Sequence, residues 1–216
     1  MKILGTLVLF ALSSVAFADV TVTYSNTGPL DDGNVLFNGT GTSTTDPPIG
    51  RVGTQLFQFD SVGDTLKASA AGQAKVEATD DTFQDLSFYS TTGQVFTSAI
   101  LNLTVNRQGQ PGNIPDGQVI FTFEMLNEAP IIYAPLELDA NGNNFYTITA
   151  AAPEKILRVT LATTLALDDV KQVRIGGIQP EIPGEDPTVP EPMTMTLFGS
   201  GLGLLIAARA RKSRRK

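Results

Sequence analysis

Residues 118–124 read QVIFTFE, and this stretch decides the fold class. Its large hydrophobic side chains, Val119, Phe121 and Phe123, fall on alternate positions, which is typical of a strand that buries one face. The same kind of alternation, rich in β-branched and aromatic residues, recurs along the chain. It predicts six further clear strands, at residues 20–24, 55–59, 85–89, 100–105, 145–149 and 157–161.

About ten strands in all are expected, because Gly, Pro, Asn or Asp separate the hydrophobic runs and no long amphipathic helix interrupts them. Short strands at this spacing predict an all-β fold, an antiparallel β-sandwich with jelly-roll or other Greek-key connections. We assign residues 19–178 to this domain. Its length is enough for one domain with a sizeable core.

The N-terminus has the pattern of a secretory signal peptide at residues 1–18. Lys2 supplies a positive charge, and residues 3–12 form an apolar run that is too short to span a membrane. Ala16 and Ala18 provide the small side chains of a cleavage site, so Asp19 is the expected first residue of the mature protein. Export would place the domain outside the cytoplasm.

The C-terminus changes composition twice. Residues 179–189 are rich in proline and acidic residues, which favours an extended linker over sheet or helix. Residues 193–208 are apolar, and as a helix they would extend about 24 Å, a marginal transmembrane span. A basic stop-transfer tail follows and predicts a cytoplasmic C-terminus under the positive-inside rule: Arg209, Arg211, Lys212, Arg214, Arg215 and Lys216.

The segment 190–216 resembles the PEP-CTERM sorting signal of exported bacterial proteins. The resemblance rests on Pro190, Glu191 and Pro192, the apolar run and the basic tail, in that order. It implies that the motif is recognised by a membrane protease of the exosortase type, after which the protein is displayed at the cell surface or released. The expected path is therefore an intermediate anchored in the inner membrane, followed by a cell-surface or extracellular location.

Charge and residue types exclude several functions. The segment from Asp19 to Glu191 holds all 22 acidic residues and only eight basic ones, a net charge of −14. Such a domain should not bind nucleic acid, because phosphate contacts need a basic face. The chain has no His and no Cys, so neither a Ser-His-Asp nor a Cys-His site can be assembled within it.

Residues 139–144 read DANGNN and allow two interpretations. Asp139, Asn141 and Asn143 place oxygen atoms on alternate positions, as a calcium loop would, although the spacing does not fit an EF-hand. Asn141-Gly142 between two strand-like stretches is also a hairpin-turn signal. We expect the turn, and keep calcium at these three residues as the alternative, with no other cofactor.

The sequence therefore predicts an exported cell-surface or matrix protein with a non-catalytic structural or binding role linked to exopolysaccharide. The alternative is a secreted hydrolase that acts on polysaccharide through two carboxylates. Candidate acidic clusters for it are Asp31-Asp32 and Asp80-Asp81 with Asp85. The expected partners are the exosortase-type protease, the membrane through the C-terminal helix, and exopolysaccharide.

Overall fold

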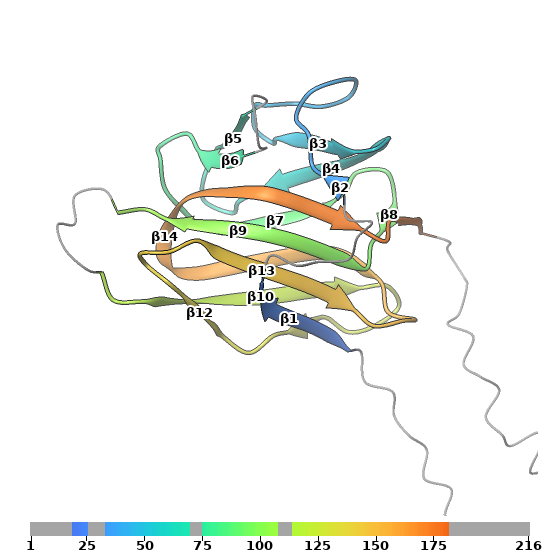
Figure 1. Ribbon diagram of the computed structural model, residues 1–216. Helices are drawn as coiled ribbons and strands as arrows, with labels where there is room; N and C mark the ends of the chain where they lie inside the picture. The colour runs from blue at the N-terminus through green and yellow to red at the C-terminus, as the bar shows by residue number, and fades with distance from the viewer. Residues whose placement is uncertain (1–18, 26–32, 70–74, 108–113, 182–216) are drawn as a thin grey trace, which may run out of the picture. The chain divides into compact units, whose positions relative to one another are not determined.

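The structure is a computed structural model that describes residues 19–25, 33–69, 75–107 and 114–181 (Figure 1). The secondary structure of these residues consists of strands joined by turns and loops, which confirms the all-β prediction. The strands are β1 Val20–Tyr24, β2 Gly33–Asn34, β3 Ile49–Val52, β4 Gln55–Asp60, β5 Leu66–Ser69, β6 Lys75–Ala78, β7 Phe83–Ser90, β8 Gln94–Val95, β9 Ser98–Val105, β10 Gly117–Met125, β11 Ile131–Ile132, β12 Leu136–Leu138, β13 Asn144–Ala150, β14 Ile156–Gly176 and β15 Gln179–Pro180. All seven clearly predicted strands are present.

The strands form two antiparallel layers that share β14. The first layer runs β3, β4, β7, the N-terminal part of β14 and β10, with β11 and β12 on the far side of β10. The second layer runs β1, β13, β9 and the C-terminal part of β14, followed by β2 and β6, with β5 beyond β6. Figure 1 shows β14 passing from one layer to the other.

The length of β14 explains this arrangement. β14 has 21 residues, whereas an ordinary strand has about five or six. If it were straight it would be about 70 Å long. Its pairing is irregular between Ala162 and Leu167: the pairs with β10 end at Thr163, and from Leu167, which still pairs with Phe83 of β7, the strand pairs with β9. Both parts bury hydrophobic side chains, for example Leu161 and Val170, which are 0% exposed.

The core lies between the two layers. Phe121 of β10 and Tyr146 of β13 belong to different layers, and their ring centroids are 5.4 Å apart. A second aromatic group links Phe59, Phe88 and Phe96, with centroid distances of 5.8 and 5.9 Å. The chain has no cysteine, so no disulfide supports this packing. The core thus confirms the β-sandwich.

The domain extends two residues beyond its predicted end. Gln179 and Pro180, assigned from sequence to the linker, pair with Val95 and Gln94. The prediction that this segment could not join a sheet was therefore wrong for its first two residues. The pair β8–β15 forms a separate two-stranded sheet, and proline is tolerated at such an edge because its missing N–H need not serve a second neighbour.

The predicted signal peptide 1–18, the linker beyond Glu181, the motif Pro190-Glu191-Pro192, the apolar run and the basic tail all lie outside the described residues. Within the part of the chain that is described, no helix is long and apolar enough to cross a membrane.

Candidate functional site

The turn at residues 139–144 is held by its own polar side chains. Asp139 Oδ1 accepts a hydrogen bond from the backbone N–H of Asn141 at 2.7 Å. Asn144, which is 0% exposed, accepts from the N–H of Asp139 at 2.8 Å and donates to the carbonyls of Asp139 and Leu103 at 2.9 and 3.2 Å. A Cβ at Gly142 would lie 2.4 Å from Asp139 Oδ2, so a larger residue there would displace the Asp139 carboxylate. The predicted turn is confirmed.

The predicted hairpin is wrong, although the turn is present. Strand β12 before the turn pairs with β10 in the first layer, while β13 after it pairs with β9 and β1 in the second. The turn therefore joins the two layers instead of two neighbouring strands. Asn-Gly favours a tight reversal, but the pairing of the flanking strands depends on residues far away in the sequence.

Calcium at Asp139, Asn141 and Asn143 remains a prediction. Asp139 and Asn143 already accept hydrogen bonds from the protein. Asp139 Oδ1 accepts from the N–H of Asn141. The carbonyl of Asn143 accepts from the Tyr24 hydroxyl at 2.8 Å, and its Oδ1 accepts from Asn102 at 3.5 Å. Among the described residues, no group of three or more Asp, Glu, His or Cys side chains is placed to hold a metal ion.

A hollow of about 450 Å³ opens beside this turn. We call it the Tyr24 hollow, and its described lining residues are Tyr24, Leu136, Glu137, Asp139 and Tyr146. Tyr24 comes from β1 and Tyr146 from β13, both in the second layer, whereas Leu136 and Glu137 come from β12 in the first. The hollow therefore lies where the two layers meet.

Tyr24 is the exposed aromatic side chain of this hollow. It lies on the same side of β1 as Val20 and Val22, which are each 6% exposed, yet Tyr24 is 58% exposed. Its ring meets that of Tyr146 edge to face, with centroids 5.5 Å apart and planes at 86°. Together with the hydrogen bond to the Asn143 carbonyl, this contact fixes the ring without burying it.

The electrostatic environment of the hollow is negative. Partial burial raises the pKa of Tyr24, and the carboxylates of Asp139 and Glu137 raise it further. The pKa of Tyr146 is raised above the usual range of tyrosine, chiefly by burial, and its hydroxyl donates to the Glu137 carbonyl. Both hydroxyl groups therefore stay protonated at neutral pH. No Lys or Arg is found among the described lining residues.

Sequence analysis pointed to Asp139 and missed the other residues of the hollow. Tyr24, Glu137 and Tyr146 come together only because β1 pairs with β13, with Tyr24 opposite Tyr146 in the register. One signal was available: Tyr24 ends a strand in which Val20 and Val22 carry the buried face. A tyrosine at the end of such a face combines an apolar ring with a polar tip that suits a boundary with water.

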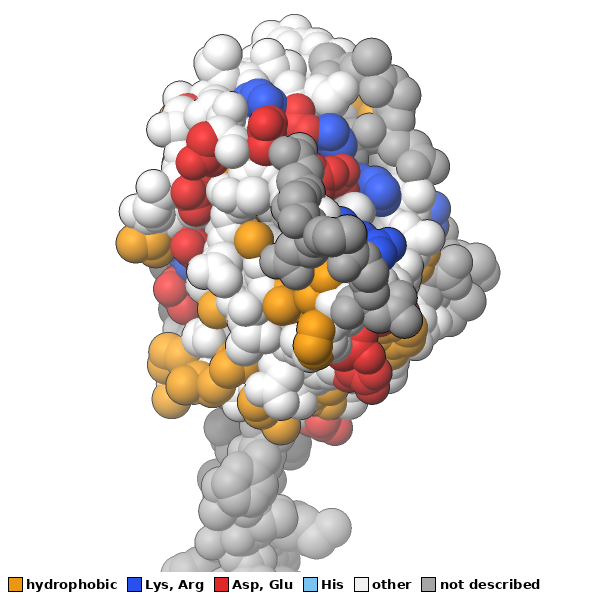
Figure 2. Space-filling model, turned by 90° about the vertical axis from the view of Figure 1, so that its left-hand side faces the viewer, with side chains coloured by type: hydrophobic (Ala, Val, Ile, Leu, Met, Phe, Trp, Pro, Cys, Tyr) orange, Lys and Arg blue, Asp and Glu red, His pale blue; other side chains and the backbone are white. Residues whose placement is uncertain are grey.

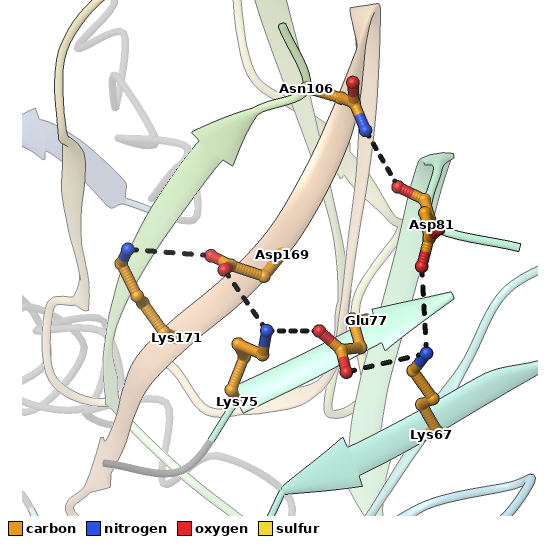
Figure 3. Close-up of polar contacts among 7 residues, drawn as sticks. All are labelled: Lys67, Lys75, Glu77, Asp81, Asn106, Asp169 and Lys171. Atoms are coloured by element: carbon orange, nitrogen blue, oxygen red, sulfur yellow. Dashed lines mark hydrogen bonds and ion pairs between the residues drawn. The ribbon is translucent and has the colours of Figure 1, made fainter. Parts of the chain in front are cut away.

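A second polar cluster lies on the outer side of the second layer. Figure 3 draws the seven residues of this cluster, which we call the lysine cluster: Lys67, Lys75, Glu77, Asp81, Asn106, Asp169 and Lys171. Lys75 contacts Glu77 closely and lies 3.8 Å from Asp169, while Lys171 reaches the other oxygen of Asp169 at 3.8 Å. Lys67 lies 3.7 Å from Glu77 and 3.9 Å from Asp81.

These contacts tie the hairpin of β5 and β6 to β14. Figure 2 shows basic and acidic side chains lying together in the upper part of one face, with hydrophobic side chains in its lower part. Asp169 is only 5% exposed, and its Oδ1 has no hydrogen-bond partner among the described residues. The pKa of Lys75 is raised, first by its hydrogen bond to Glu77, so the ammonium group is favoured. We interpret the cluster as structural.

Replacing Lys75 with Met should lower the free energy of unfolding by about 1–2 kcal/mol, because it leaves the buried Asp169 carboxylate with Lys171 alone. Lys67→Met is the matched control on the neighbouring strand. Lys67 lies near Glu77, which keeps its contact with Lys75, and near Asp81, whose side chain is 64% exposed, so a loss of roughly 0–1 kcal/mol is expected. Urea unfolding of both variants tests this, and equal losses would show that Asp169 does not depend on Lys75.

In the second predicted acidic cluster, Asp81 and Asp85 have different partners. Asp81 contacts Lys67, while Asp85 accepts from the Ser61 hydroxyl at 3.1 Å and from the N–H of Val62 at 2.7 Å. Asp31 and Asp32 lie outside the described residues.

The structure instead joins Glu128 and Glu154, which the sequence analysis did not single out. Glu128 lies between β10 and β11, and Glu154 between β13 and β14. Glu154 is 9% exposed. Burial, followed by a hydrogen bond to Glu128 and repulsion from its charge, raises the pKa of Glu154 to about 7. A hydrogen-bonded carboxyl pair is closer than the roughly 5 Å or more that separates the two carboxyl groups of glycosidases.

No protein-family model matches this chain, and no curated protein matches it either. Among solved structures, one similarity is to a mutant of a family 29 carbohydrate-binding module, studied for the mechanism of its ligand recognition. The two share 11% sequence identity, and the match covers 75% of this chain and 91% of the module. Its TM-score is 0.21, which is too low to support an argument about fold or ligand.

Proposed function

We propose that this protein is exported, sorted through its C-terminal signal, and acts at the cell surface or in the extracellular matrix as a non-catalytic polysaccharide-binding protein. The signal-peptide pattern at 1–18 and the tail at 190–216 support export and sorting. The acidic β-sandwich, which lacks the residues of His- or Cys-based catalysis, supports a binding role.

The Tyr24 hollow is the observation that carries the binding role. A sugar ring has an apolar C–H face and a rim of hydroxyl groups, so its site needs an exposed aromatic ring beside fixed hydrogen-bonding groups. Tyr24 supplies a ring held in place by Tyr146 and the Asn143 carbonyl. Glu137 and Asp139 supply acceptors. The volume, about 450 Å³, is in the range of small-molecule sites, roughly 300–1,000 Å³.

The arrangement of the carboxylates favours binding over cleavage. A glycosidase places two carboxyl groups on opposite sides of the bond it breaks. Glu137 and Asp139 instead flank the buried Leu138 on one stretch of chain, and Asp139 Oδ1 already accepts from Asn141. The hydrolase alternative differs in one measurable outcome, the release of new reducing ends from a bound polysaccharide.

Affinity electrophoresis of the full-length chain in detergent, through gels that contain neutral, uronate-rich or amino-sugar polysaccharides, tests the proposal. At least one polysaccharide should retard the protein, without release of reducing ends. Tyr24→Ala should weaken this binding about tenfold, equivalent to about 1.4 kcal/mol. Val62→Ala is the control, since Val62 is 96% exposed and does not line the hollow. Unretarded migration in every gel would refute the proposal.

A further inference from the structure

We infer that the Tyr24 hollow selects a glycan that carries a free ammonium group, a hexosamine unit whose amine is not acylated. This inference rests on the proposed polysaccharide binding and names the chemical class of the ligand. Three features of the hollow carry it: the sign of its charge, the exposure of an aromatic ring, and the absence of basic side chains among its described lining residues.

The two ionisable acids of the hollow have the same sign. Glu137 and Asp139 both line it, and both raise the pKa of Tyr24. Because Tyr24 and both carboxylates line the same hollow, the ring lies within their field. A ligand bound against this ring meets the same field, which favours a cation and disfavours a carboxylate. A uronate unit would bring a third negative charge to the site and find no described basic side chain in its wall.

The aromatic ring favours the same ligand. The face of a tyrosine ring attracts an ammonium group, and the attraction grows where water is partly excluded. Tyr24 is suited to this role because its ring is 58% exposed while its hydroxyl is anchored on the Asn143 carbonyl at 2.8 Å. The ring therefore need not be ordered when a ligand binds, which avoids part of the entropic cost of binding.

The hydroxyl groups of a neutral sugar could donate to the same carboxylates, but a neutral sugar would gain neither the ion pair nor the cation–π contact. A bare divalent cation would gain the charge, but calcium takes six to eight oxygen ligands, and one oxygen of Asp139 is already engaged by Asn141. An amine on a sugar ring matches both the charge and the ring. We therefore expect about tenfold preference for the amine over its acetylated form.

Isothermal titration of the full-length chain in detergent tests this, with oligomers of glucosamine, N-acetylglucosamine and galacturonate as probes. Titration at about pH 6 keeps the amine charged and the carboxyl groups of ordinary Glu and Asp ionised. The glucosamine oligomer should bind about tenfold more tightly than the acetylated one, and the galacturonate oligomer most weakly. Equal affinity for the first two, or a preference for galacturonate, would overturn the inference and leave polysaccharide binding intact.

Two variants locate the selectivity. Glu137→Gln should reduce the preference for the amine over its acetylated form to about threefold, because it removes one of the two negative charges of the hollow. Glu124→Gln is the matched control, since Glu124 has a side chain 53% exposed on β10 and does not line the hollow. Selectivity that survives in Tyr24→Ala, or displacement of the oligomer by equimolar calcium, would overturn the inference. Failure to bind any of the three oligomers or any polysaccharide would refute the proposed function itself.

Discussion

Glu191→Gln is expected to leave the folded domain unchanged while slowing the processing of the C-terminal tail by roughly 10- to 150-fold. Glu191 lies in the motif Pro190-Glu191-Pro192, outside the described residues. If a protease recognises this motif, the lost carboxylate removes a charge-assisted hydrogen bond or ion pair worth about 1.5–3 kcal/mol. Full-length protein should then accumulate in the membrane fraction of a host that has an exosortase-type protease.

Glu185→Gln is the matched control for this experiment, because it removes the same charge from the linker but not from the motif. The extension of a proline-rich linker comes from the restricted φ of proline, so neither substitution should alter it. Immunoblots of membrane and released fractions compare the two variants with wild type. Indistinguishable fractionation of all three would reduce the segment to a simple anchor and would contradict the proposed sorting.

The individual strands could be predicted from sequence because alternation is a local signal. Residues 118–124 and 20–24 carry that signal and became β10 and β1. The extent of β14 could not be predicted in the same way. Its hydrophobic residues on either side of 163–166 face one core, but they pair with different strands. The local sequence of β14 does not indicate which strands pair with its N-terminal part and which with its C-terminal part.

The candidate site could be predicted only where it depends on local chemistry. The turn at 139–144 was identified because Asn-Gly and the Asp side chain stabilise reversals by themselves. Tyr24 and Tyr146 are far apart in the sequence, and their contact follows from a register that long-range packing sets. The pairing of Glu128 with Glu154 has the same origin, since these residues lie in loops that follow strands of different layers.

The pair Glu128–Glu154 predicts how stability depends on pH. Glu154 has a pKa of about 7 in the folded protein, whereas an unfolded Glu has its ordinary value of 4.5. Between these values the folded state holds a proton that the unfolded state has released. The free energy of unfolding therefore falls as the pH rises from about 4.5 to about 7. Above that range this group destabilises the folded protein to its full extent.

Glu154→Gln should remove this loss. The amide can donate a hydrogen bond to the Glu128 carboxylate, as the protonated acid does, but it carries no charge at any pH. We expect the variant to be about 2 kcal/mol more stable than wild type at about pH 8 and nearly equal to it at about pH 4.5, after allowance for screening of the exposed Glu128 by solvent.

Urea unfolding at both pH values measures the difference, and Glu124→Gln controls for loss of an acidic charge elsewhere on the domain. A stability gain that is the same at both pH values would show that the pKa of Glu154 is not raised in the folded protein, and would contradict the prediction.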